Sequence, residues 1–175
     1  SNYDPAASFG DGSCAFGLQL GDYHEGGYIV KFNNGYDETD GGIVASNYSE
    51  ANSFTLGRWS SLTNNIGTSI SDGAQNTINI IASDGSAGNP IANLTVLPHN
   101  GYSDWYLPSF SELQLISDGT GSLYSGLNTN DLYYWSSTEF ASDPANKAYK
   151  WKAEFNWGTS DNKDELFGVM FFRTF

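Results

Sequence analysis

The chain has 175 residues and a mass of 19.0 kDa, enough for one domain with a sizeable hydrophobic core. Its formal net charge is -13 and its sequence pI is about 4.1, so its surface would repel nucleic acids and anionic membranes. Aromatic residues make up 15% of the chain, which excludes an acidic disordered polymer, and no apolar run approaches the roughly 20 residues of a membrane span.

The charge is unevenly distributed along the chain. Residues 1–138 carry 14 acidic and two basic residues, for a net charge of -12, whereas residues 139–175 carry six acidic and five basic residues, for a net charge of -1. Two interpretations of the acidic part stay open, namely solubility in a salty medium and binding of a divalent cation. The mixed, aromatic final segment is the region where we expect the partner to bind.

The first 16 residues resemble the end of a short extracellular repeat. Residues 2–7 have the sequence NYDPAA and residues 11–14 have DGSC, which is similar to a repeat in surface proteins of marine bacteria and in viruses. The resemblance implies a linker module at residues 1–16, before a main domain at residues 17–175. Its carboxylates suit Ca²⁺, which prefers hard oxygen ligands, so we take as candidate metal ligands Asp4 and Asp11. The alternative is that Asp-Pro and Asp-Gly form turns and hold no metal.

Cys14 is the single cysteine of the chain. It is either a free thiol in a reducing compartment or one half of a disulfide whose partner lies upstream of Ser1. The resemblance to a cysteine-containing extracellular repeat favours the second interpretation.

The main domain begins with two predicted strands. Residues 28–32 and 42–45 are short runs of strand-forming residues, and the Asn-Asn-Gly sequence after the first is typical of a hairpin turn. A helix is then predicted from Asp72, a suitable N-cap, to Ala82. Helical spacing places three apolar residues on its buried face, and glycines end it: Ala74, Ile78 and Ile81 on the face, Gly85 and Gly88 at the end.

A second helix is predicted to begin after Pro108. Ser109 and Glu112 have the S-x-x-E spacing of a capping box, in which each side chain accepts a hydrogen bond from the other residue's backbone. Leu113 and Ile116 follow on one helical face, which we expect to be buried.

The last third of the chain has the character of strands. Residues 133–138 are rich in strand formers, and residues 149–157 alternate between apolar and polar side chains, which predicts one antiparallel strand with a buried and an exposed face. Residues 161–164 are polar and predict a loop, and the apolar run 166–172 predicts a buried strand. Strands, then two helices, then strands predict an α+β fold.

Several segments resemble the motifs of a large bacterial and phage family. Residues 101–113 have the sequence GYSDWYLPSFSEL, similar to G-x-x-D-W-x-L-P-S/T-x-x-E-L, and residues 134–139 have the second signature, YWSSTE, complete. Residues 26–30, 73–77 and 169–175 are similar to the family's first strand, first helix and C-terminus. The resemblance spans roughly residues 22–175. It implies a C-type-lectin-like fold with short twisted antiparallel sheets, two helices and long loops, related to formylglycine-generating enzymes and phage variable proteins.

In such folds the C-terminal strands and their loops usually present the ligand surface. Loops predicted at residues 140–146 and 158–165 flank the alternating strand, whose polar face would lie between them. The candidate ligand-binding residues are therefore Asn146, Tyr149, Lys150, Lys152, Glu154, Asn156, Trp157 and Asp161. Trp157 would stack on a sugar ring if exposed, although the alternation is equally consistent with a place in the core. Residues 143–146, with the sequence DPAN, only loosely resemble the Glu-Pro-Asn of calcium-dependent lectins.

No catalytic constellation stands out. A single cysteine argues against the paired-thiol chemistry of the formylglycine-generating relatives. Neither His24 nor His99 lies near a G-x-S-x-G sequence, and His24 with its neighbouring carboxylates has poor spacing for a metal site. The many acidic residues include no pair that spacing singles out for glycoside hydrolysis. We therefore expect a protein that is not an enzyme.

Two functions fit these observations. The resemblance implies a non-catalytic extracellular module for ligand binding or adhesion, on a cell surface or a phage tail, with a protein or glycan as its partner. The alternative is a structural subunit or decoration domain of a filament, fibre or virion that binds its own copies. Calcium is the cofactor that the acidic residues would hold, and we expect neither nucleic-acid binding nor membrane insertion.

Overall fold

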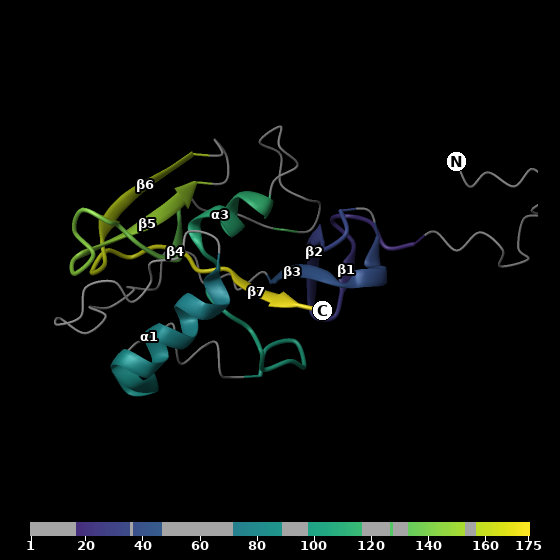
Figure 1. The fold of residues 1–175 in the computed structure, drawn as a ribbon, viewed down its shortest axis with the longest axis horizontal. Helices are drawn as coiled ribbons and strands as arrows, with labels where there is room; N and C mark the ends of the chain where they lie inside the picture. The colour runs from purple at the N-terminus through teal and green to yellow at the C-terminus, as the bar shows by residue number, and fades with distance from the viewer. Residues whose placement is uncertain are drawn as a thin grey trace, which may run out of the picture.

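A computed structural model of the chain describes residues 17–35, 37–46, 72–88, 98–116, 127, 133–152 and 157–175, with only the backbone for residues 83–88 and 157. This part contains two small antiparallel sheets and two helices (Figure 1), so the predicted α+β class is confirmed. The linker module predicted at residues 1–16, with Asp4, Asp11 and Cys14, lies outside the described residues. No helix among those described has the length and apolar character needed to cross a membrane.

The first sheet has the strand order β1-β2-β3-β7, with all neighbours antiparallel. Its strands are β1 (Tyr23–His24), β2 (Gly27–Phe32), β3 (Gly42–Ser46) and β7 (Phe171–Thr174). The two strands predicted at the start of the domain are therefore confirmed as β2 and β3. Their connection is longer than a tight hairpin, because Phe32 pairs with Gly42 and the 3-10 turn η1 (Glu38–Asp40) lies between them.

The second sheet has the order β4-β5-β6, formed by β4 (Tyr134–Glu139), β5 (Lys147–Lys152) and β6 (Trp157–Asn162). The prediction of one strand over residues 149–157 is wrong, because Lys152 pairs antiparallel with Trp157 and the chain reverses between them. Both arms of a hairpin alternate with period two, so the pattern cannot reveal the reversal. The loop predicted at residues 158–165 is likewise wrong as far as Asn162, which ends β6.

The first helix, α1 (Gly73–Gly88), begins as predicted but is longer and buries a different face. The Asp72 side chain caps it by accepting a hydrogen bond from the Gln75 backbone N–H at 2.9 Å. Ile78, predicted to be buried, has 59% of its surface exposed. The buried face contains Asn76 and Ile80 and also the following polar residue, Thr77. The apolar spacing therefore does not predict which face of α1 is buried, because hydrogen-bonded polar side chains occupy much of that face.

The second helix consists of α3 (Phe110–Leu113) followed by the 3-10 turn η2 (Gln114–Ile116). The predicted capping box is confirmed, with both hydrogen bonds between Ser109 and Glu112 present. Leu113 and Ile116 are fully buried, as their spacing predicts.

The apolar run 166–172 connects the two sheets. Only its last two residues lie in a strand, and Leu166 is 55% exposed, so the prediction of a strand along the whole run is wrong. The Gly168 carbonyl accepts from the Trp135 backbone N–H of β4, and the Gly168 N–H donates to the carbonyl of Tyr133, just before β4. Phe172 exchanges two backbone hydrogen bonds with Tyr106. Residues 168–172 are buried, and they pack in core clusters with the large side chains Trp105, Leu107, Trp135 and Trp151. One segment therefore ties both sheets into one core.

Three of the segments that carry the family resemblance meet beside β4. The Ser137 backbone N–H donates to the Pro108 carbonyl at 2.8 Å, and the Ser137 hydroxyl accepts from the Asn76 side chain at 3.2 Å. The Thr138 hydroxyl oxygen accepts from the Phe110 backbone N–H at 3.0 Å. The motif residues thus hold α1, α3 and β4 together.

Candidate functional site

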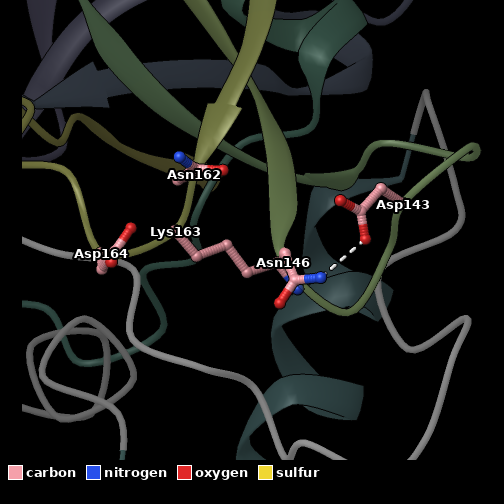
Figure 2. A pocket seen from close by; sticks show the side chains of 5 residues that line it. All are labelled: Asp143, Asn146, Asn162, Lys163 and Asp164. Carbon is pink, nitrogen blue, oxygen red and sulfur yellow. Dashed lines mark hydrogen bonds between the residues drawn. The ribbon is translucent and has the colours of Figure 1, made fainter.

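A polar pocket of about 270 Å³ lies at one end of the second sheet (Figure 2). One wall is the turn that follows β4, and the other is the end of β6 with the turn after it. Lys147 at the start of β5 pairs with Asn162 at the end of β6, and this pairing brings the two walls together. We call this site the β5–β6 pocket, and its lining residues are Asp143, Asn146, Asn162, Lys163 and Asp164.

A buried ion pair joins the two walls. The Lys163 ammonium donates to Glu139 Oε1 at 2.7 Å and to the Pro144 carbonyl at 2.7 Å, while the Lys163 backbone N–H donates to the Asn146 carbonyl at 2.8 Å. The Lys163 and Glu139 side chains are 1% and 3% exposed. A buried charge is tolerated only when it is paired and hydrogen-bonded, so this lysine holds the turn at residues 143–146 in place.

The other lining residues direct polar groups into open space. Asn146 donates from its amide to Asp143 Oδ1 at 2.9 Å, which fixes that turn (Figure 2). Within the part of the chain that the structure describes, the side chains of Asn162 and Asp164 make no hydrogen bond or ion pair, and both residues are exposed. The pocket therefore offers carboxylate and amide groups that are free to bind a hydrogen-bonding ligand.

Beside the pocket, Lys150 lies among aromatic rings. Its ammonium is 4.1 Å from the ring centroids of both Tyr133 and Phe167, and it donates to Asp161 Oδ2 at 2.6 Å. Lys150 was predicted to lie on an exposed face, and this is wrong, because the residue is only 7% exposed. The aromatic faces and the carboxylate together stabilise its charge, so a lysine can occupy a position that the alternating pattern assigned to solvent.

The pKa of Asp161 lies below its ordinary value. Burial acts to raise this pKa, but hydrogen bonds from the Lys150 ammonium and the Asn162 backbone, with the positive charges of Lys150 and Lys147, outweigh it. Asp161 is therefore ionised throughout the neutral range. Its carboxylate pairs with Lys150 and stabilises the sheet, and the residue does not line the pocket.

The predicted binding residues are only partly brought together. Asn146 lines the pocket, while Asp161 and Lys150 pair with each other next to it. Tyr149 packs between Phe110 and Phe140, with ring centroids 4.8 and 5.4 Å apart. Lys152 is half-buried, with its ammonium 6.0 Å from the Tyr133 ring centroid. The remaining predictions, Glu154, Asn156 and the side chain of Trp157, lie outside the described residues.

Sequence reasoning did not select most of the pocket. Asp143, Asn162, Lys163 and Asp164 are not among the predicted binding residues, although they lie in the DPAN sequence at residues 143–146 and in the polar run at residues 161–164. The sequence feature that could have indicated the pocket is the pair of polar turns on either side of a hairpin. This feature is informative only when residues 149–157 are known to contain a hairpin.

A second polar cluster lies on the first sheet, away from the pocket. Arg173 donates to Asp104 at 2.5 Å and to the Glu25 carboxylate at 2.7 Å, and its guanidinium carbon lies 3.9 Å from the Tyr102 ring centroid. Glu25 and Asn100 have positive φ angles of 43° and 50°, in the left-handed region that non-glycine residues seldom adopt. Arg173 thus holds a tight turn against the C-terminal strand.

Each of the two histidines packs against an aromatic ring. His24 packs against Phe175 with ring centroids 4.8 Å apart, and His99 packs against Trp105 at 5.4 Å. Burial holds the pKa of His99 below its ordinary value. Among the described residues, no group of three or more His, Cys, Asp or Glu side chains is placed to hold a metal ion.

Comparison with known proteins adds no relative. No protein-family model matches the chain, and no curated protein is significantly similar to it. The functional assignment therefore depends on the geometry of the site and on the motifs of the sequence.

Proposed function

We propose that this chain is a non-catalytic extracellular module for ligand binding or adhesion, with a C-type-lectin-like arrangement of its two sheets. It would act on a cell surface or a virion and present the β4-β5-β6 sheet and its turns to a glycan or protein partner. The acidic, aromatic composition and the family motifs at residues 101–113 and 134–139 support this assignment.

The observation that carries the proposal is the β5–β6 pocket. All five of its lining residues are polar or charged, its walls are held by a buried ion pair, and the side chains of Asn162 and Asp164 have no partner within the described part of the protein. Free polar groups on a rigid support are what a binding site requires, because the protein loses little conformational entropy when the ligand arrives. The pocket also lies in the C-terminal region where the charge becomes mixed and where we expected the partner.

The experiment is a binding assay of the purified chain on an array of immobilised glycans and on intact cells. We expect binding that Asn162→Ala weakens at least severalfold, because the variant removes an exposed amide from the pocket and should leave the fold intact. Thr174→Ala is the matched control, since it also truncates an exposed strand residue but on the other sheet.

Two outcomes would contradict this proposal. Equal loss of binding, or none, in Asn162→Ala and Thr174→Ala would place the site elsewhere. Absence of all binding, together with a stable homo-oligomer or filament in light scattering, would favour the structural subunit instead.

A further inference from the structure

We propose that the β5–β6 pocket takes one sugar unit that carries a protonated amine, of the hexosamine class, and disfavours acidic sugars. This inference rests on the proposed function and specifies the ligand of the same site. It follows from the size of the pocket, from the groups that are free within it and from the charge that remains after its lysine is paired.

The size of the pocket limits the ligand to one small unit. Pockets for drug-sized ligands have volumes of about 300–1,000 Å³, and a pocket of about 270 Å³ lies just below this range. No aromatic side chain is among the lining residues, so recognition by stacking on a ring is not provided here. The ligand is therefore a single ring whose hydrogen bonds supply the affinity.

The free groups suit a ligand rich in donors. Asp164 has no hydrogen bond or ion pair within the described residues, and only Oδ1 of Asp143 is engaged, by Asn146. These carboxylate oxygens only accept hydrogen bonds, whereas the Asn162 amide both donates and accepts. Sugar hydroxyls can satisfy the amide, and an ammonium group satisfies a carboxylate best, because a hydrogen bond between opposite charges is the stronger kind.

The lysine of the pocket does not favour an anion. Its ammonium is 1% exposed and donates to Glu139 and to the Pro144 carbonyl, so its charge is already neutralised within the wall. Lys147 and Lys150 lie on β5, do not line the pocket and act on Asp161. The carboxylates of Asp143 and Asp164 therefore dominate the field in the pocket, and a uronic acid or a sulfated sugar would meet like charge.

The test compares glucose with two monosaccharides that each differ from it at one carbon, namely glucosamine, with an amine at C2, and glucuronate, with a carboxylate at C6. Dissociation constants are measured by NMR titration of the whole chain, at a pH where the amine is protonated and with a chelator present. We expect glucosamine to bind about tenfold more tightly than glucose, and glucuronate to bind most weakly. Asp164→Asn should remove most of the advantage of glucosamine and leave the affinity for glucose unchanged.

Glu165→Gln is the matched control. Glu165 is the next residue along the chain, is also exposed and does not line the pocket, and its substitution changes the net charge by the same amount. The control should retain the preference for glucosamine, which separates a local contact from a general effect of negative charge.

The ligand class is wrong if glucosamine has no advantage over glucose, if glucuronate binds most tightly, or if Asp164→Asn and Glu165→Gln behave alike. It is also wrong if the chelator abolishes binding, since a metal would then be the primary ligand. In each of these cases the adhesion proposal still holds if the chain binds to the glycan array and the Asn162→Ala variant does not. Absence of binding both on the array and to intact cells overturns both proposals.

Discussion

Lys163 is a charged side chain that lies inside the protein. Its sequence neighbourhood is polar and predicts an exposed loop, yet 1% of the side chain is accessible to solvent. The long aliphatic stem allows the ammonium to reach Glu139, which is 24 residues earlier in the chain, and the Pro144 carbonyl. Neither partner can be identified from the residues next to Lys163, so this part of the site was beyond sequence reasoning.

We predict that Glu139→Ala destabilises the protein by about 3–5 kcal/mol, because it leaves the Lys163 ammonium buried without its counter-charge. Thermal or urea unfolding measures the change. The double variant Glu139→Leu with Lys163→Met should recover much of this loss, since apolar side chains of similar volume need no charge compensation. A loss below about 1 kcal/mol for Glu139→Ala would mean that the pair is open to water.

Lys150 is a second lysine whose burial the local sequence does not predict. The alternation of residues 149–157 assigned it to solvent, whereas Tyr133, Phe167 and Asp161 surround its ammonium. Binary patterning treats lysine as polar and therefore as exposed, but a cation between aromatic faces can be desolvated at little cost. Charge reversal at Lys150 would consequently test the fold, and binding is better tested at exposed pocket residues.

At the scale of elements, one carboxylate connects the starts of both helices. Glu112 Oε2 accepts from the Ser109 backbone N–H at 2.8 Å, from the Ser109 hydroxyl at 2.6 Å and from the Gly73 backbone N–H at 2.9 Å. Glu112 Oε1 accepts from the Tyr106 hydroxyl at 3.1 Å. Burial, together with the negative charge of Glu112, raises the pKa of Tyr106. The capping box predicted from S-x-x-E is thus also a link between α1 and α3.

We predict that Ser109→Ala costs about 1 kcal/mol of stability, as is usual for an N-cap, and that Glu112→Ala costs more. The second variant removes the acceptor of donors on both helices and of the Tyr106 hydroxyl, whereas the first removes only the Ser109 side chain. Thermal unfolding of the two variants measures the difference. Equal effects would indicate that the bond from Gly73 to Glu112 contributes nothing.

The element predictions succeeded where the signal is local. The Asp72 cap, the capping box and the burial of Leu113 and Ile116 depend on residues within about four positions of one another. The prediction of the buried face of α1 is wrong because Asn76 and Thr77 make hydrogen bonds to β4 and to Leu107, which lie 30 or more residues away in the chain. Burial of a polar side chain depends on such distant partners, and spacing carries no information about them.

At the scale of the whole molecule, the stability should decline in two steps as the pH falls. The folded-state pKa of His99 lies below its ordinary value because of burial, so the unfolded chain binds the proton first. Stability is therefore lost as the pH falls through about 6.5 towards the folded pKa. The Asn100 amide contacts His99 Nε2 at 3.2 Å, and this contact is a hydrogen bond only while that nitrogen is unprotonated.

The second step belongs to two carboxylates whose pKa values lie below the ordinary value. Hydrogen bonds from Thr39 and Asn34 lower the pKa of Asp37, and hydrogen bonds from Lys150 and the Asn162 backbone lower that of Asp161 despite its burial. Their contribution is complete above about pH 3.9 and is lost as the pH falls through the folded pKa values. We predict that melting temperatures between pH 8 and 2.5 show both declines, that His99→Gln flattens the first and that Asp161→Asn flattens part of the second. A first decline that His24→Gln removes and His99→Gln does not would contradict the assignment.

Local patterns in the sequence are sufficient to predict the α+β class, the starts of both helices and the strands β2, β3 and β4. These features follow from periodicity, caps and turn residues, which act over a few positions of the chain. Three features follow only from packing in space: the chain reverses within residues 149–157, Lys150 and Lys163 are buried, and the turns at residues 143–146 and 162–164 form one pocket. Each of these depends on which distant segments pack together, and the free energy of a buried charge is set by its partners in space.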